Sequence, residues 1–148
     1  MPDFLKGVMM MAAIGTLAAC SPSPAPQAQT TPAAPTGGAA LLGAEWAVFE
    51  IAGKPIVADS KPTILFEDGR VAGAGSCNRF MGGYTVAPDG LKLEFSQMAS
   101  TMMACPDPLM QQEGLFLKTL GDVTGYTVAA DGVLTLTTAD GRSIKARR

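Results

Sequence analysis

The chain has 148 residues, which leaves room for one domain once a targeting segment is removed. Its 11 basic and 13 acidic residues give a net charge of −2 without runs of either sign. This balance argues against nucleic-acid binding, which depends on clustered Lys and Arg. The sequence contains no histidine, so it lacks the usual general base near neutral pH and the commonest metal ligand. We therefore expect no nucleic-acid partner, no enzyme activity, no metal and no cofactor.

Residues 1–19 are typical of a bacterial lipoprotein signal peptide. The uncharged run Gly7–Ala19 is shorter than the roughly 20 residues that span a bilayer. It ends in Leu17-Ala18-Ala19-Cys20, which resembles the bacterial lipobox, whose cysteine is acylated and becomes the new N-terminus. We expect lipid attachment at Cys20, with the membrane as the partner of its acyl chains. Ser21 at the next position resembles lipoproteins sorted to the outer membrane and facing the periplasm. The alternative is a plain signal peptide with a coincidental cysteine.

Residues 20–40 are expected to form a disordered tether after the lipidated cysteine. No periodic apolar face is present, and five prolines forbid a helix; they are Pro22, Pro24, Pro26, Pro32 and Pro35. Twenty such residues reach roughly 25 Å as a coil and about 60 Å in a polyproline conformation. This segment would hold a domain of residues 41–148 away from the membrane surface.

Four Asp-Gly dipeptides indicate hairpins in the domain, because both residues tolerate positive φ. They are Asp68-Gly69, Asp89-Gly90, Asp131-Gly132 and Asp140-Gly141. Short apolar or alternating stretches lie around them, and the expected strands cover residues 45–51, 63–66, 70–73, 84–86, 91–95, 126–128, 133–137 and 143–146. The sequence thus predicts a mainly β, β-rich α+β fold, a small antiparallel barrel-like sheet of about eight short strands.

One segment favours a helix that closes an end or face of this barrel. Asp107 is a fair N-cap, Pro108 suits the first turn, and Gly121 is a plausible stop. The residues at helical spacing between them are Leu109, Glu113, Phe116, Leu117 and Leu120. Glu113 is a carboxylate on the apolar side, and we expect it to bond to the backbone or to a neighbour at the rim of the domain.

Cys77 and Cys105 remain once Cys20 is acylated, and an even number of cysteines in an oxidising compartment favours a disulfide. Closing a loop of about 29 residues stabilises a domain by roughly 3–4 kcal/mol in the chain-entropy model. The alternative is a pair of buried free thiols on adjacent strands. A catalytic thiolate is disfavoured because no histidine is present to activate it.

The segments around these cysteines resemble those of META domains, as in the HslJ-type heat-shock lipoproteins. Gly75-Ser76-Cys77-Asn78-Arg79-Phe80 followed by Gly82-Gly83-Tyr84 resembles G-x-C-N-x-F-x-G-x-Y, and residues 98–105 resemble M-A-S-T-(K/R)-M-A-C. Met102 stands where the family usually has Lys or Arg. The motif residues, interpreted as structural, are Gly75, Asn78, Phe80, Gly82, Tyr84, Met98, Ser100, Thr101 and Met103. We expect the glycines to allow tight bends and Asn78 to form a turn.

The resemblance covers residues 41–148 and implies a small β-rich barrel with one helix in a cell-envelope setting, sometimes linked to stress. It implies no reaction. We therefore expect a monomeric, non-enzymatic envelope lipoprotein that acts in stress tolerance or envelope maintenance by binding an envelope protein or a small apolar ligand. A groove lined by Trp46, Phe80, Tyr84 and the methionines would favour a ligand.

Two alternatives remain open at this point. The first is an inhibitor of a lysozyme or protease, with the turn Arg79–Gly83 or the segment Pro106–Met110 as the inhibitory loop. The second is soft-metal binding, because thioethers suit Cu(I), although methionine is more often core filler. The methionines near the cysteines are Met81, Met98, Met102, Met103 and Met110.

Overall fold

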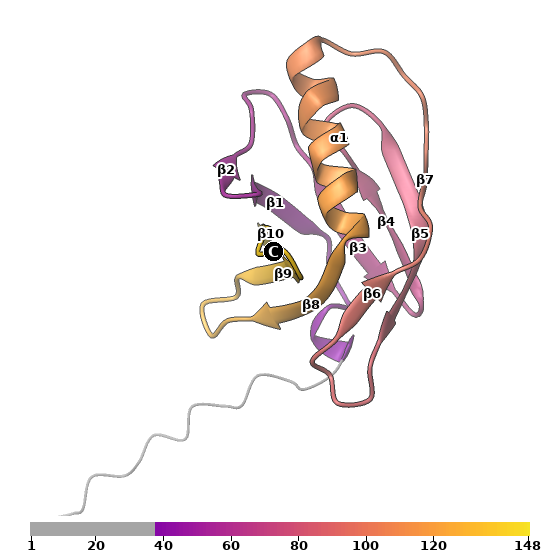
Figure 1. Cartoon of the computed structure of the whole chain (residues 1–148), viewed down its shortest axis with the longest axis vertical. Helices are drawn as coiled ribbons and strands as arrows, with labels where there is room; N and C mark the ends of the chain where they lie inside the picture. The colour runs from indigo at the N-terminus through magenta and orange to yellow at the C-terminus, as the bar shows by residue number, and fades with distance from the viewer. Residues whose placement is uncertain (1–37) are drawn as a thin grey trace, which may run out of the picture. The chain divides into compact units, whose positions relative to one another are not determined.

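The computed structural model describes residues 38–148 (Figure 1). The signal peptide, Cys20 and most of the predicted tether lie outside the described residues. The last three residues of that tether, Gly38–Ala40, form the 3-10 turn η1, which corrects the expectation of disorder there. Leu41 follows with 0% of its surface exposed, and its burial in the core explains why the chain is ordered at this point.

Within these residues, ten strands and one helix follow η1. They are β1 (Trp46–Ile51), β2 (Lys54–Pro55), β3 (Thr63–Glu67), β4 (Arg70–Ala74), β5 (Arg79–Val86), β6 (Leu93–Phe95), β7 (Ala99–Ser100), α1 (Asp107–Gly121), β8 (Val123–Val128), β9 (Leu134–Thr138) and β10 (Ser143–Arg147).

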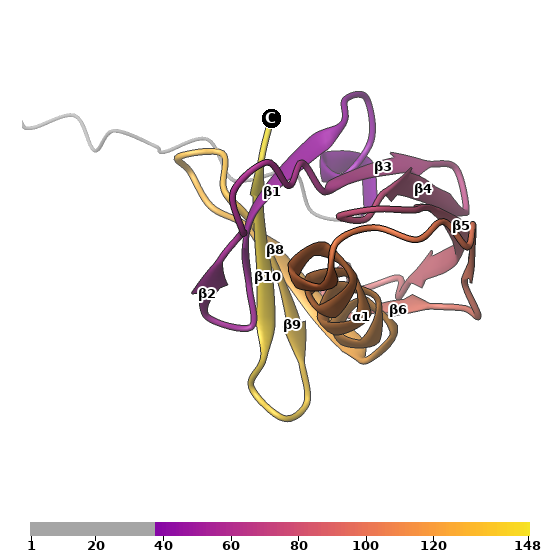
Figure 2. The same cartoon turned by 90° about the horizontal axis from the view of Figure 1, so that it is seen from above.

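The strands pair antiparallel in the order β6-β5-β4-β3-β1-β10-β9-β8, with β2 added to β1 and β7 added to β5. A bridge between Lys92 and Gly125 joins the two ends of this order, so the sheet nearly closes into a barrel. Figure 2 shows the sheet curving around α1, which packs against β1, β6 and β10. The mainly β, barrel-like fold with one helix is thus confirmed.

The Asp-Gly dipeptides occupy the turns that the sequence predicts. Their glycines Gly69, Gly90, Gly132 and Gly141 have φ of 68°, 71°, 81° and 86°, a region that glycine enters without steric cost. In three of these turns the aspartate stabilises the bend through its side chain, since Asp89, Asp131 and Asp140 each accept a hydrogen bond from the backbone N–H two residues on.

The expected turn Arg79–Gly83 is wrong, because these residues belong to β5 and pair with both β4 and β7. The glycines serve close packing at this place. A Cβ on Gly82 would lie 2.7 Å from Cγ of Met98, and one on Gly83 would lie 2.9 Å from Oγ of Ser96. The segment that carries β7 can therefore lie directly over the strand.

The helix begins one residue earlier than a cap at Asp107 requires. Pro106 is the N-cap, without a side-chain cap, and its carbonyl accepts hydrogen bonds from the N–H groups of Leu109 and Met110. Asp107 therefore lies inside the first turn, where a carboxylate still interacts favourably with the positive end of the helix.

The interior of the barrel is filled by side chains. Phe116 and Leu120 of α1 are fully buried there, and the Phe116 ring meets Phe80 edge to face at 5.6 Å. The indole N–H of Trp46 donates to the Leu41 carbonyl at 2.9 Å. The expected groove residues Trp46, Phe80 and Tyr84 all belong to this core.

Figure 1 shows that different elements lie at the two ends of the barrel. The turn η1 lies at the lower end, where Gly38 packs against Val86 at the end of β5. The N-terminal end of α1 and the connection that reaches it from β7 lie at the upper end. Gly38, the first described residue, therefore lies at the end of the barrel opposite to the start of the helix.

Replacing Phe116 by alanine should lower the free energy of unfolding by about 3–5 kcal/mol, because it removes a ring from the closed core. Urea denaturation measures this change. Leu91→Ala is the control, since Leu91 is 70% exposed, and it should change stability by less than about 0.5 kcal/mol. Similar losses in both variants would contradict the assignment of the core.

Candidate functional site

The two cysteine motifs and the helix meet around the carboxylate of Glu113. This side chain is buried, with 5% of the residue exposed. Its Oε2 accepts hydrogen bonds from the backbone N–H groups of Cys77 at 2.7 Å and Asn78 at 2.6 Å. Its Oε1 accepts from Nδ2 of Asn78 at 2.7 Å. The expectation that Glu113 bonds to backbone and to a neighbour is therefore confirmed.

These contacts decide the charge of Glu113. Burial by itself raises the pKa of the carboxyl, but the hydrogen bonds from Asn78 and Cys77 favour the charged form and hold the pKa below its ordinary value of 4.5. The residue is therefore a carboxylate at neutral pH. A general acid needs a raised pKa instead.

Asn78 extends the network to the second motif. It is buried, and its Oδ1 accepts hydrogen bonds from Oγ1 of Thr101 at 2.9 Å and from the N–H of Met103 at 2.6 Å. Thr101 also pairs with Arg79 through its own N–H and through Oγ1. Asn78 therefore connects the chain on both sides of the disulfide to α1, a larger role than the expected turn.

Gly75 is needed for close approach to the helix. A Cβ at this position would lie 2.5 Å from Oε2 and 2.9 Å from Cγ of Glu113. The expected bend is present, because residues 75–78 connect the paired strands β4 and β5 and the Gly75 N–H donates to the Asn78 carbonyl at 2.6 Å. Gly75 makes the bend without a positive φ, and its missing Cβ lets the carboxylate lie against it.

Gln112 forms a second polar contact beside Glu113, which sequence reasoning missed. Its Nε2 donates to Oγ of Ser60 and of Ser76, both at 2.6 Å, and its Oε1 accepts from the N–H of Val57 at 2.6 Å. A signal was present, because Gln112 precedes the buried Phe116 by four residues and so lies on the same side of the helix.

Cys77 and Cys105 form a disulfide with a Cα–Cα distance of 6.0 Å, as the sequence predicts. Together with Asn78 it fixes the segment 101–105 against the domain. The side chains of Met102 and Met103 nevertheless point outward, and these residues are 97% and 61% exposed.

The remaining motif residues lie in or beside the sheet. Phe80 and Tyr84 are core residues, Met98 is half-buried against the core, and Ser100 is exposed in β7, where it pairs with Phe80. The polar atoms of Glu113, Asn78 and Gln112 all have partners within the protein. These hydrogen bonds stabilise the fold, and the atoms that form them are not free to bind a ligand.

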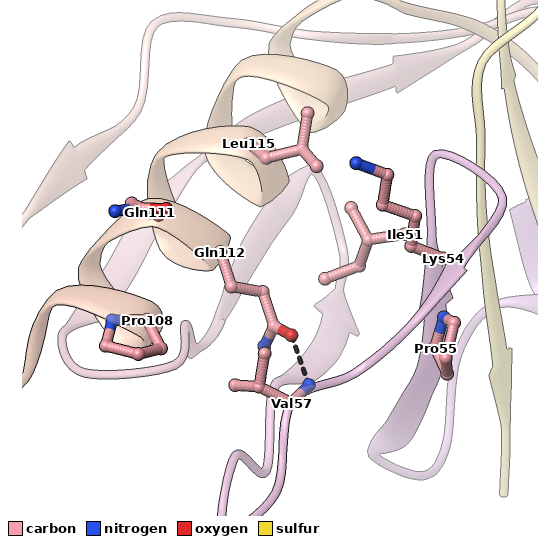
Figure 3. Close-up of a pocket in the computed structure, with 8 residues that line it drawn as sticks. All are labelled: Ile51, Lys54, Pro55, Val57, Pro108, Gln111, Gln112 and Leu115. Carbon is pink, nitrogen blue, oxygen red and sulfur yellow. Dashed lines mark hydrogen bonds between the residues drawn. The ribbon is translucent and has the colours of Figure 1, made fainter.

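A cleft of about 360 Å³ opens between the β1–β2 hairpin and the N-terminal half of α1 (Figure 3). It is lined by Ile51, Lys54, Pro55, Val57, Pro108, Gln111, Gln112 and Leu115. The hydrogen bond between Gln112 and Val57 joins its two walls. This groove has none of the expected lining residues Trp46, Phe80 and Tyr84.

Among residues 38–148, no group of three or more His, Cys, Asp or Glu side chains is placed to hold a metal ion. No helix in the same range is long and apolar enough to cross a bilayer. Met98 packs against the core, whereas Met81 and Met102 are exposed. Soft-metal binding by the methionines stays a prediction.

The family model of the META domain matches residues 39–148. An NMR structure of a protein from Burkholderia xenovorans is 26% identical with a TM-score of 0.61, and the match covers 86% of this chain and 94% of that one. A second NMR structure is 26% identical, with a TM-score of 0.55 and coverage of 69% and 86%. The crystal structure of a DUF4847 family protein from Bacteroides vulgatus is 14% identical, with a TM-score of 0.58 and coverage of 72% and 93%, a likeness of fold alone. No curated protein matches the sequence.

Replacing Glu113 by glutamine should lower the free energy of unfolding by about 2–3 kcal/mol. The amide presents N–H groups to a site made of donors and leaves a buried donor unpaired. Glu94→Gln is the matched control, because Glu94 is exposed and forms no ion pair among the described residues. Chemical denaturation of both variants measures the difference, and equal small effects would contradict the role of Glu113.

The stabilisation from Glu113 should depend on pH in a defined direction. Its pKa is lower in the folded state, so its contribution is complete above pH 4.5 and is lost as the pH falls through the folded-state pKa. The difference in unfolding free energy between the wild type and Glu113→Gln should therefore shrink below about pH 4.5. Asp122 and Asp140, whose pKa values are also lowered, are present in both proteins and cancel. A difference that stays constant down to pH 3 would contradict the assignment.

Proposed function

The chain belongs to the META domain family, and from this premise we propose that it is a non-enzymatic lipoprotein of the cell envelope whose domain acts by binding. Lipid on Cys20 anchors it, most simply to the outer membrane facing the periplasm. Its role is in stress tolerance or envelope maintenance. The lipobox and the proline-rich segment support the anchor.

The observation that carries the proposal is the arrangement of the two ends of the barrel. The described chain starts at η1, whereas the start of α1, which borders the cleft, and the connection from β7 lie at the other end (Figure 1). Attachment at η1 leaves the cleft and the disulfide-bound segment uncovered. A partner in the periplasm can then reach them.

Binding is favoured over catalysis because of how the polar residues are used. The carboxylate of Glu113 and the amides of Asn78 and Gln112 are engaged with one another and with the backbone. The cleft offers the mixture typical of ligand sites, a mostly apolar lining with a few polar groups.

Inhibition of a periplasmic hydrolase is the second candidate, and the segment Thr101–Pro106 is the observation in its favour. Hydrogen bonds from Asn78 and the disulfide hold it in place while Met102 stands 97% exposed. It replaces the two loops expected from the sequence, because Arg79–Gly83 is part of β5 and residues 107–110 form the first turn of α1.

The lipid anchor is tested by metabolic labelling with a fatty-acid analogue. The wild-type chain should take up label and sediment with membranes, and Cys20→Ser should do neither. Label in the Cys20→Ser variant, or an unlabelled wild type, would contradict the anchor.

The binding role is tested by complementing a deletion strain under heat and envelope-active compounds. The wild-type gene should restore growth, whereas Leu115→Trp, which fills the cleft, should not. Leu91→Trp makes the same change at an exposed position and should restore growth fully. A deletion strain that grows normally under these stresses would overturn the proposal.

A further inference from the structure

The cleft between the β1–β2 hairpin and α1 combines a cation with an apolar surface. Lys54 is exposed in β2 and, among residues 38–148, forms no ion pair. Figure 3 shows its side chain running along Ile51 toward Leu115, so that the amino group stands over the opening. Lysine stems commonly lie along apolar surface in this way while the charge stays in water.

The walls of the cleft are apolar and fixed. Ile51 is 2% exposed and anchored in the core, and Leu115 is half-buried against it. Gln112 uses all of its polar groups on Ser60, Ser76 and Val57. Its amide therefore forms a rigid wall of the cleft and has no polar group left to bond to a ligand.

The charge at this place comes from Lys54 rather than from the helix terminus. Pro106 and Pro108 have no N–H, and the N–H groups of Leu109 and Met110 are taken by the carbonyl of Pro106. The first turn of α1 therefore offers few free donors to an anion. The nearest residue of opposite charge on β1, Glu50, is paired with Lys145 at 2.8 Å.

The cleft is large enough for a small ligand. About 360 Å³ lies at the lower end of the roughly 300–1,000 Å³ typical of small-molecule sites. It suits one short apolar chain with its polar head at the rim. Charge complementarity then makes an anionic head the best match for Lys54.

We infer that the cleft binds an amphipathic anion, a carboxylate on a medium-length apolar chain. The carboxylate pairs with the Lys54 amino group, and the chain lies on Val57, Pro108 and Leu115. This inference rests on the proposed binding function and specifies the ligand class of that site.

The test is calorimetric titration of the full lipidated chain in phospholipid nanodiscs, with empty nanodiscs as the blank. The probes are octanoate and 1-octanol, which carry the same chain with and without charge. Octanoate should bind about three- to fivefold more tightly, the range of a partly exposed ion pair. This advantage should fall in high salt because the pair is screened.

Three variants test whether Lys54 causes the tighter binding of octanoate and whether the chain binds in the cleft. Lys54→Met keeps the stem and should remove the advantage of octanoate, whereas Lys61→Met, the same change at another exposed lysine, should leave it unchanged. Leu115→Trp should abolish binding of both probes. Thermal unfolding checks that each variant is folded.

The negative outcomes separate the two claims. Equal binding of octanoate and octanol, unaffected by Lys54→Met but lost in Leu115→Trp, would overturn the anion and leave the binding function standing. Absence of binding by both probes would overturn the ligand class, and the complementation experiment would then decide the proposed function independently.

Discussion

The structure depends on one buried carboxylate. Glu113 lies on α1, and its oxygens accept hydrogen bonds from Cys77 and Asn78, which are far from it in sequence. A buried charge is costly unless it is fully hydrogen-bonded, so the chain around Cys77 must take up the one conformation that offers these donors. The fixed Asn78 side chain in turn accepts hydrogen bonds from Thr101 and Met103 and so fixes their positions. The helix, the sheet and the second cysteine segment are positioned together as a result.

The residues in this network stabilise the fold, and they differ from the residues that are available to bind a ligand. Within the motifs, Asn78 and Thr101 use their polar side chains inside the protein, together with Glu113, so these groups are not available to a ligand. The residues that line the cleft, such as Lys54 and Leu115, lie outside both motifs. Members of one family can therefore keep the same fold while differing in what they bind.

Local patterns were sufficient to predict much of the fold. Asp-Gly turns carry their own backbone preference, so the four hairpins followed from dipeptides alone. The disulfide followed from the number of cysteines and from the expectation of an oxidising compartment. Contacts between distant segments were not predictable in this way. Nothing local distinguishes Gly82 in a strand from a glycine in a turn, and the apposition of Met98 that requires it is visible only in three dimensions. The specific partners of Gln112 and Glu113 were not predictable either, because they lie more than 30 residues away in the sequence.

The central claim is that Glu113, Asn78 and Thr101 act as one cooperative unit, and a double-mutant cycle tests it most directly. Glu113→Gln and Thr101→Val change residues that share Asn78 as a partner. Unfolding free energies of the wild type, both single variants and the double variant give the coupling between them. The account predicts a coupling free energy of about 0.5–3 kcal/mol. When either substitution frees the Asn78 side chain, the contact of Asn78 with the other residue is weakened as well. Additive effects of the two substitutions would show independent contacts and contradict it.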